Sequence, residues 1–136
     1  MVKEKILMIG GKRKTSVAKA RIVEGTGKVT INNIPHTSLN TFHKLAIEEP
    51  LQIAKNVLKK LDFDIYVSIS GGGRESQIEA ARLAIAKILV EKTKSAKLKE
   101  AFVNYDRHLL VADVRRKEAY KPGDSKARAK RQTSYR

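Results

Sequence analysis

The sequence predicts an α+β domain in which helices pack on one face of a single sheet. The order of the predicted elements favours this class, and the length and composition suit a single small folded domain. The length of 136 residues suits one ordinary domain. Strand patterns come before, between and after helix patterns, and a hydrophobic fraction of 41% is enough for a small core. The chain has no cysteine, which excludes disulfide scaffolds and thiol catalysis.

The first predicted elements are two strands on either side of a glycine-hinged basic loop. Residues 5–9 form a short apolar run, and residues 16–23 alternate between small or apolar and basic side chains. The loop between them spans residues 10–16. The alternation predicts one buried face and one basic face, with Ala18, Ala20 and Ile22 inward and Lys19 and Arg21 outward.

A third strand is predicted immediately afterwards. Residues 25–27 are turn-forming and lead into residues 28–31, so we expect strands 16–23 and 28–31 to form a hairpin. Asn32, Asn33 and Pro35 then end this strand.

Helices follow, separated by one clear strand. A short helix is predicted over residues 38–46, and Pro50 fits the first turn of a second helix. The second helix has its apolar positions on one face, at Leu51, Ala54, Val57, Leu58 and Leu61. Residues 62–70 alternate strictly and predict a strand with Ile65, Val67 and Ile69 on its inner face.

The last predicted elements are helices. Three glycines lead into a helix over residues 74–92, whose apolar stripe consists of Ile78, Ala81, Ile85, Ile88 and Leu89. A shorter helix is predicted over residues 96–103. No stretch is long and apolar enough for a membrane span or a signal-peptide core, so we expect a soluble intracellular protein without a membrane partner.

Positive charge is concentrated at the two ends of the chain. The formal net charge is +15, of which residues 1–24 carry +5, residues 25–106 carry +3 and residues 107–136 carry +7. We therefore predict a globular body over residues 1–106 and a basic extended tail over residues 107–136. Such an excess of cations indicates a polyanionic partner. We expect the body to be a monomer without a homo-oligomer, because nothing in its composition requires a second chain to cover its core.

Two loops have residue types that suit phosphate. The turn Gly71, Gly72 and Gly73 lies between a strand and a helix, where backbone N–H groups could hold a phosphate, or where glycine is needed only for positive φ. The second loop is the one at residues 10–16. It lacks the glycine before Lys14 that a nucleotide-binding P-loop has, and a strand follows it where a P-loop has a helix. Its charge and hydroxyl groups instead suit nucleic-acid backbone contacts by Lys12, Arg13, Lys14 and Thr15.

No combination of residues predicts catalysis. The three histidines lack the spacing of metal ligands, no nucleophile elbow occurs, and no acid–base group has a positioned partner. We therefore expect neither an enzyme nor a protein with a metal or another cofactor. The aromatic signature of an RNA-binding sheet and the loop of a KH module are also missing.

Four segments in order resemble one family, the small-subunit ribosomal protein S-nine family, over nearly the whole chain. They are GKRKTSVAKAR at 11–21 with GKVTINN at 27–33, DIYVSISGGG at 64–73, LLVADVRRKE at 109–118, and KPGDSKARAKRQTSYR at 121–136. The ending resembles the archaeal and eukaryotic branch. Val114 and Thr133 depart from the proline and lysine that are common in the family at these positions.

The resemblance implies a two-layer sandwich like the second domain of ribosomal protein S-five, with a left-handed β-α-β crossover. It also implies binding of small-subunit ribosomal RNA in the head of the subunit, beside neighbouring ribosomal proteins. The long C-terminal tail would then reach the transfer RNA in the peptidyl site, which Ser134, Tyr135 and Arg136 would contact. The other RNA-binding residues expected are Arg115, Arg116, Lys117, Lys126, Arg128, Lys130 and Arg131.

Two other readings remain open from the sequence. The first is a protein subunit of an RNA-processing enzyme such as ribonuclease P, which has a related fold but no need for an arginine-rich ending. The second is a small phosphotransferase built on the glycine turn, which nucleotide binding by the isolated protein would support.

Overall fold

The computed structural model describes residues 6–123, 126–131 and 133–135, and residues 7–109 of it form one mixed sheet covered by helices. An α+β fold is therefore confirmed. The elements are β1 (Leu7–Arg13), β2 (Ser16–Glu24), β3 (Val29–Ile31), β4 (Ile34–Pro35), the 3-10 turn η1 (His36–Ser38), α1 (Thr41–Leu58), β5 (Phe63–Ser70), α2 (Arg74–Thr93), α3 (Ala96–Tyr105) and the 3-10 turn η2 (Arg107–Leu109).

The strand order in the sheet is β1-β2-β5-β3-β4, with β3 and β5 parallel and the other pairs antiparallel. The predicted hairpin between residues 16–23 and 28–31 is therefore wrong, because β5 lies between these two strands. The tight hairpin of this region is instead β1–β2, in which Arg13 pairs with Ser16 around a two-residue turn. A parallel neighbour for β3 requires a crossover, and α1 supplies it.

Residues 25–28 do not form a hairpin turn because they are held by the start of β5. Oδ1 of Asp64 accepts hydrogen bonds from the backbone N–H groups of Thr26, Gly27 and Lys28, at 2.8, 3.0 and 2.9 Å. These donors lower the pKa of Asp64, with the bond from Lys28 the largest cause. Gly25 makes room for this carboxylate, since a Cβ atom there would lie 2.2 Å from Cγ of Asp64.

The predicted glycine loop at residues 10–16 is also wrong, because β1 continues through it to Arg13. The strand has glycine at position 11 because α2 crosses it closely: a Cβ atom there would lie 2.5 Å from the carbonyl oxygen of Ala80. Lys14 alone has positive φ, 53°, in the turn that follows. The asparagines at 32 and 33 also have positive φ and form the turn between β3 and β4.

Pro50 does not begin a second helix. It lies inside the continuous helix α1, where its ring is buried beside Ile47, Leu51 and Ala54. A proline in a helix removes one backbone hydrogen bond. Packing of this apolar face on α2 and α3 nevertheless holds the helix together on both sides of Pro50.

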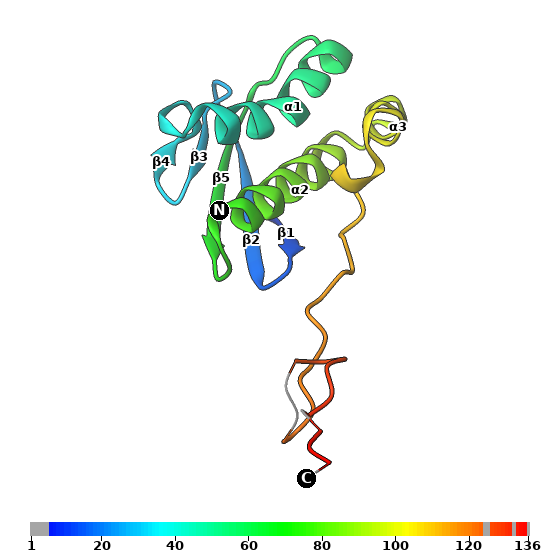
Figure 1. Ribbon diagram of the computed structural model, residues 1–136. Coiled ribbons are helices and arrows are strands. Elements are labelled where there is room, and N and C mark those ends of the chain that lie inside the picture. The colour runs from blue at the N-terminus through cyan, green and yellow to red at the C-terminus, as the bar shows by residue number, and fades with distance from the viewer. Residues whose placement is uncertain (1–5, 124–125, 132, 136) are drawn as a thin grey trace.

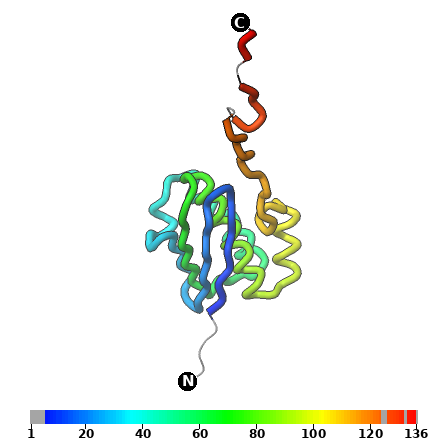
Figure 2. Tube along the Cα trace, turned by 90° about the horizontal axis from the view of Figure 1, so that it is seen from below, coloured from blue at the N-terminus to red at the C-terminus, as the bar shows by residue number. Residues whose placement is uncertain are grey.

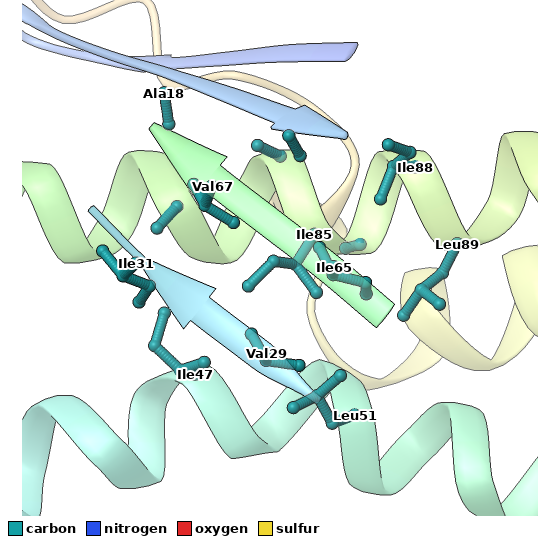
Figure 3. Close-up of a cluster of buried hydrophobic side chains, with 14 of the residues drawn as sticks. Ala18, Val29, Ile31, Ile47, Leu51, Ile65, Val67, Ile85, Ile88 and Leu89 are labelled. Carbon is teal, nitrogen blue, oxygen red and sulfur yellow. The ribbon is translucent and has the colours of Figure 1, made fainter. Parts of the chain in front are cut away.

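The core lies between the inner face of the sheet and the helices α1 and α2 (Figure 3). The predicted inward residues of β2 and β5 are all buried, as is the whole predicted stripe of α2. Residues 62–70, 74–92 and 96–103 were expected as strand, helix and helix, and β5, α2 and α3 confirm them within a few residues. The close approach of α2 to the sheet follows from its buried alanines, Ala80, Ala81, Ala84 and Ala86.

The helices cover one face of the sheet, and no described helix or strand covers the opposite face, which we call the open face (Figures 1 and 2). The described residues from 111 onward contain no helix or strand, and they run past the β1–β2 turn and away from the sheet. Over the described residues, no helix has the length and apolar character needed to cross a membrane.

Candidate nucleic-acid interface

Three of the predicted phosphate-contacting segments meet at one end of the sheet. The β1–β2 turn, the loop after β5 and the segment after η2 all reach this end, although they are far apart in the sequence (Figure 1). The first two are in direct contact, because a Cβ atom on Gly71 would lie 2.7 Å from the carbonyl oxygen of Thr15.

A groove of about 560 Å³ joins the β1–β2 turn to the third segment. We call it the basic groove, and its lining residues are Arg13, Lys14, Thr15, Arg115, Arg116 and Lys117. Five of these six residues are cationic and the sixth has a hydroxyl group. Because guanidinium, ammonium and hydroxyl groups are the usual partners of phosphate oxygens, this arrangement suits a nucleic-acid backbone.

Arg13 differs from the other cations of the groove because most of its side chain is buried. Its Nε atom lies 2.6 Å from Oε2 of Glu79 on α2, and its Nη2 atom lies 3.7 Å from Oδ2 of Asp113. Only 14% of the side chain is exposed. Since β1 residues alternate between the two faces, Arg13 points toward α2 whereas Lys12 is exposed. Arg13 therefore joins the hairpin, the helix and the C-terminal segment.

Asp113 organises the other side of the groove. Its carboxylate accepts from the side chain of Arg115, with Nη2 at 2.7 Å and Nε at 3.0 Å, and from the backbone N–H of Arg115. The hydrogen bonds from Arg115 hold the pKa of Asp113 far below its usual value, and the Arg13 charge acts in the same direction. The same ion pair raises the pKa of Arg115. The carboxylate thus fixes this segment while the Arg115 side chain stays 79% exposed.

The glycine turn combines backbone conformation with close packing. Gly71 and Gly72 have φ values of 76° and 66°, which residues with a side chain rarely adopt. A Cβ atom on Gly72 would also lie 1.9 Å from Oγ of Ser16. The buried Oγ atoms of Ser16 and Ser76 are 2.8 Å apart under the turn, and Oγ of Ser76 accepts from the N–H of Gly73. Backbone conformation and close packing in the turn are therefore sufficient reasons for glycine at positions 71 and 72.

A second set of charges ties the helices together beside the groove. Nη2 of Arg82 on α2 pairs with Oε2 of Glu49 on α1, and Nη1 of Arg82 lies 3.4 Å from Oδ2 of Asp106 after α3. A cavity of about 210 Å³ lies here, lined in part by Arg13, Arg82 and Asp113. The described residues hold no group of three His, Asp or Glu side chains that could bind a metal ion.

The predicted contact residues nearer the C-terminus lie in the described part of the segment after residue 117, with the exception of the last residue. Arg128 forms an exposed ion pair with Glu118 at 2.9 Å, and Nε of Arg131 donates to the carbonyl of Gly123 at 2.5 Å. The carbonyl of Lys126 accepts from Ala129, and Tyr135 is 94% exposed. Lys130 and Ser134 are described, whereas Arg136 lies outside the described residues.

Sequence reasoning did not find Asp113, Glu79 or Arg82. A signal existed only for Asp113, which lies two residues before the basic cluster and could have been read as its local counter-charge. Glu79 and Arg82 face other elements through tertiary packing, so their spacing within α2 did not distinguish them from surface charges. The pair Arg21 and Tyr66 on the open face was missed for the same reason.

Comparison with known proteins defines the class to which this fold and basic surface belong. A family model described as "Ribosomal protein S9/S16" matches residues 11–136. The chain is 43% identical to "Small ribosomal subunit protein uS9" of Methanococcus vannielii over 135 residues, covering 97% of this chain and 99% of that protein. Proteins with the same name are 44% identical in Methanococcus maripaludis strain C7, with equal coverage, and 42% identical over 133 residues in Methanothrix thermoacetophila.

The matches identify a ribosomal protein, a structural protein and not an enzyme. Within that class, the chain belongs to the ribosomal protein S9/S16 family. The phosphotransferase and processing-enzyme readings are therefore set aside.

Proposed function

We propose that this protein is a structural constituent of the small ribosomal subunit in the cytoplasm. In this proposal it binds ribosomal RNA in the subunit head, beside neighbouring ribosomal proteins, and its C-terminal residues contact the transfer RNA in the peptidyl site. The relatives carry the name of a small-subunit protein. The net charge of +15 favours a polyanionic partner.

The observation that carries the RNA-binding proposal is the basic groove. It combines cations that are a hundred positions apart in the sequence, at Lys14 and at Arg115, Arg116 and Lys117. Contacts within the fold position two of its walls, one through the β1–β2 hairpin and the other through the bonds of Asp113 to Arg115. Cations presented on a fixed framework lose less side-chain entropy on binding phosphate than cations on a free chain.

Individual roles follow from the placement of each residue. We assign phosphate contacts to Lys12, Lys14, Thr15, Arg115, Arg116 and Lys117. Arg13 is assigned mainly to positioning the groove, because carboxylates already surround its guanidinium. Gly73 is the member of the glycine turn that suits RNA contact, since no atom lies within 4 Å of where its Cβ would be.

The C-terminal segment is proposed as an RNA-directed extension of the packed body. Leu109 is buried in the core, and the described residues after it are half-buried or exposed. The Arg128–Glu118 pair is exposed, so exchange of Glu118 for a phosphate costs little. We assign RNA contacts to Lys126, Arg128, Lys130 and Arg131, and transfer-RNA contacts to Ser134, Tyr135 and Arg136.

The fold proposal is the sandwich of the second domain of ribosomal protein S-five. Its β-α-β unit corresponds to β3, α1 and β5, because β3 and β5 are parallel neighbours and α1 connects them. The left-handed crossover that the resemblance implies belongs to this unit, and an experimental structure of the protein tests it.

Sedimentation of a native cell extract through sucrose gradients at moderate and high salt tests the function. We expect the protein to migrate with the small subunit at both salt concentrations. Migration as free protein, or with a smaller RNA, would contradict the proposal.

A further inference from the structure

The open face of the sheet carries a platform that the RNA-binding proposal above does not use. The guanidinium carbon of Arg21 lies 5.0 Å from the centre of the Tyr66 ring, which is the geometry of a cation–π pair. The two residues are direct cross-strand partners, Arg21 on β2 and Tyr66 on β5. Tyr66 is 37% exposed although it lies in the middle of the sheet.

The strand register extends this pair into a row across the sheet. Met8 on β1 is the partner of Arg21, and Thr30 on β3 is the partner of Tyr66. Met8 is 59% exposed, so the row presents apolar and planar surface to solvent. A groove of about 530 Å³ runs over it and includes Lys19 and Ser68.

The neighbouring rows supply cations and hydroxyl groups. The next row is Gly10, Lys19 and Ser68, and the one after it contains Lys12 and Ser70. Lys12, Lys19 and Arg21 therefore lie in three successive rows, about 7 Å apart along the strands. Gly10 has no side chain, so no side chain on β1 covers Lys19 from that side.

Asp64 lies on this face one row beyond Tyr66, but its carboxylate is held by three backbone N–H groups of residues 26–28. These donors reduce the repulsion that the Asp64 carboxylate would otherwise exert on an anion bound at the platform. The local positive charge thus favours binding of a polyanion. The planar groups of Arg21 and Tyr66 favour stacking of a flat ring, such as an unpaired base.

We propose that the outer face of the sheet is a second RNA site, in which one unpaired base stacks on the Arg21–Tyr66 platform and flanking phosphates contact Lys19 and Lys12. The proposal deepens, and rests on, the RNA-binding function above. Unpaired bases stack on aromatic rings and on guanidinium planes, whereas bases within a duplex have their faces covered. The site therefore selects single-stranded RNA, in contrast to the basic groove, which contacts backbone alone.

The test compares two RNA probes on the full chain. One is a short fluorescein-labelled oligoadenylate, and the other is a duplex RNA of the same strand length. We expect Tyr66→Leu to weaken oligoadenylate binding about fivefold or more, because a base stacked on an aromatic ring typically contributes at least that factor. Duplex affinity should not change, and Tyr66→Phe, which keeps the ring, should bind both probes like the wild type.

A second variant protects the test against misfolding. Arg21→Lys keeps the charge but removes the guanidinium plane, so it should weaken oligoadenylate binding more than duplex binding. Both variants are measured again with Arg116→Gln and Lys117→Gln, so that binding at the basic groove does not hide the difference. Circular dichroism confirms that each variant is folded.

Unchanged oligoadenylate affinity in folded Tyr66→Leu, or equal losses for both probes, would overturn the inference. If Tyr66→Leu does not fold, an Arg21→Lys variant that weakens both probes equally would overturn it. The wild-type sedimentation experiment is independent of these variants. Migration with the small subunit together with unchanged probe binding would therefore reject the platform and leave the proposed function standing.

Discussion

Oδ2 of Asp113 lies 3.7 Å from Nη2 of Arg13, so a residue beyond the last helix is held against the first hairpin of the sheet. Asp113 also binds Arg115 through two side-chain nitrogens. One carboxylate thus contacts cations from both walls of the basic groove.

Replacement of Asp113 by Asn should release this wall. The variant loses the charge that holds Arg13 and Arg115, so trypsin should cleave after Arg115 and Arg116 faster than in the wild type. The stability of the core should change little, because Asp113 lies outside it. Cleavage at the wild-type rate would mean that the ion pairs do not hold the segment.

The pH dependence of this contact follows from the lowered pKa of Asp113. A group whose pKa is lowered on folding contributes stability above its ordinary value, ~3.9 for Asp, and loses that contribution as the pH falls through the lowered folded value. The Asp113 carboxylate should therefore stay ionised as the pH falls below ~3.9. A carbon-13 NMR titration of its carboxyl group measures this, and a midpoint at the ordinary value would contradict the contact.

The two adjacent glycines of β1 should respond differently to alanine. Gly11→Ala places Cβ 2.5 Å from a backbone oxygen of α2, so we expect a loss of about 1–3 kcal/mol in the free energy of unfolding. Gly10→Ala is the matched control, since the nearest atom is 3.6 Å away and the side chain would point to the open face. Urea unfolding followed by circular dichroism measures both, and equal effects would argue against close α2–β1 packing.

A second pair tests the glycine turn. Gly72→Ala combines positive φ with a contact to Ser16, and should cost about 2–4 kcal/mol of unfolding free energy. Gly73→Ala has open space and negative φ, and should cost only about 0.5–1 kcal/mol, because Gly73 caps the start of α2 and alanine is a poorer N-cap than glycine. If Gly73→Ala folds normally yet weakens ribosomal RNA binding, a direct RNA approach to that backbone is supported. Unchanged RNA affinity would assign the turn a purely structural role.

The basic groove makes a prediction about salt. Combined Lys14→Gln, Arg116→Gln and Lys117→Gln should reduce the slope of log affinity against log salt for small-subunit ribosomal RNA by about 2–3, at ~0.7–0.9 for each phosphate that is no longer neutralised. Lys97→Gln with Lys99→Gln on α3, outside the groove, is the control and should leave the slope nearly unchanged. Equal slopes for the two sets would place the RNA elsewhere.

Much of the fold was predictable because its signals are local. The strand β5 alternates strictly, and α2 has an apolar stripe with helical spacing, so burial on one face was readable from the order of residues. The end of β3 at two asparagines was readable for a similar reason, since asparagine tolerates positive φ.

The errors have non-local causes. Two adjacent glycines in residues 10–11 indicate a loop by propensity, yet β1 has a glycine because the backbone of α2, about seventy positions later, approaches it. Pro50 indicates a helix start by propensity, and core packing overrides that preference. The expected hairpin failed because the hydrogen-bonding edge of β2 is taken by β5, whose position depends on the crossover helix.

Composition and local patterns were sufficient to predict the α+β class, the excess of positive charge, the absence of cysteine chemistry and the residue types suited to phosphate. These properties depend on composition and on periods of two and 3.6 residues, which are local. The three-dimensional arrangement was needed to learn which cations face the same groove, that carboxylates lie beside the Arg13 guanidinium, and that Arg21 lies over Tyr66. Those relationships depend on strand order and on close helix–sheet packing, which bring distant residues together. The spacing of these residues along the chain does not indicate such contacts.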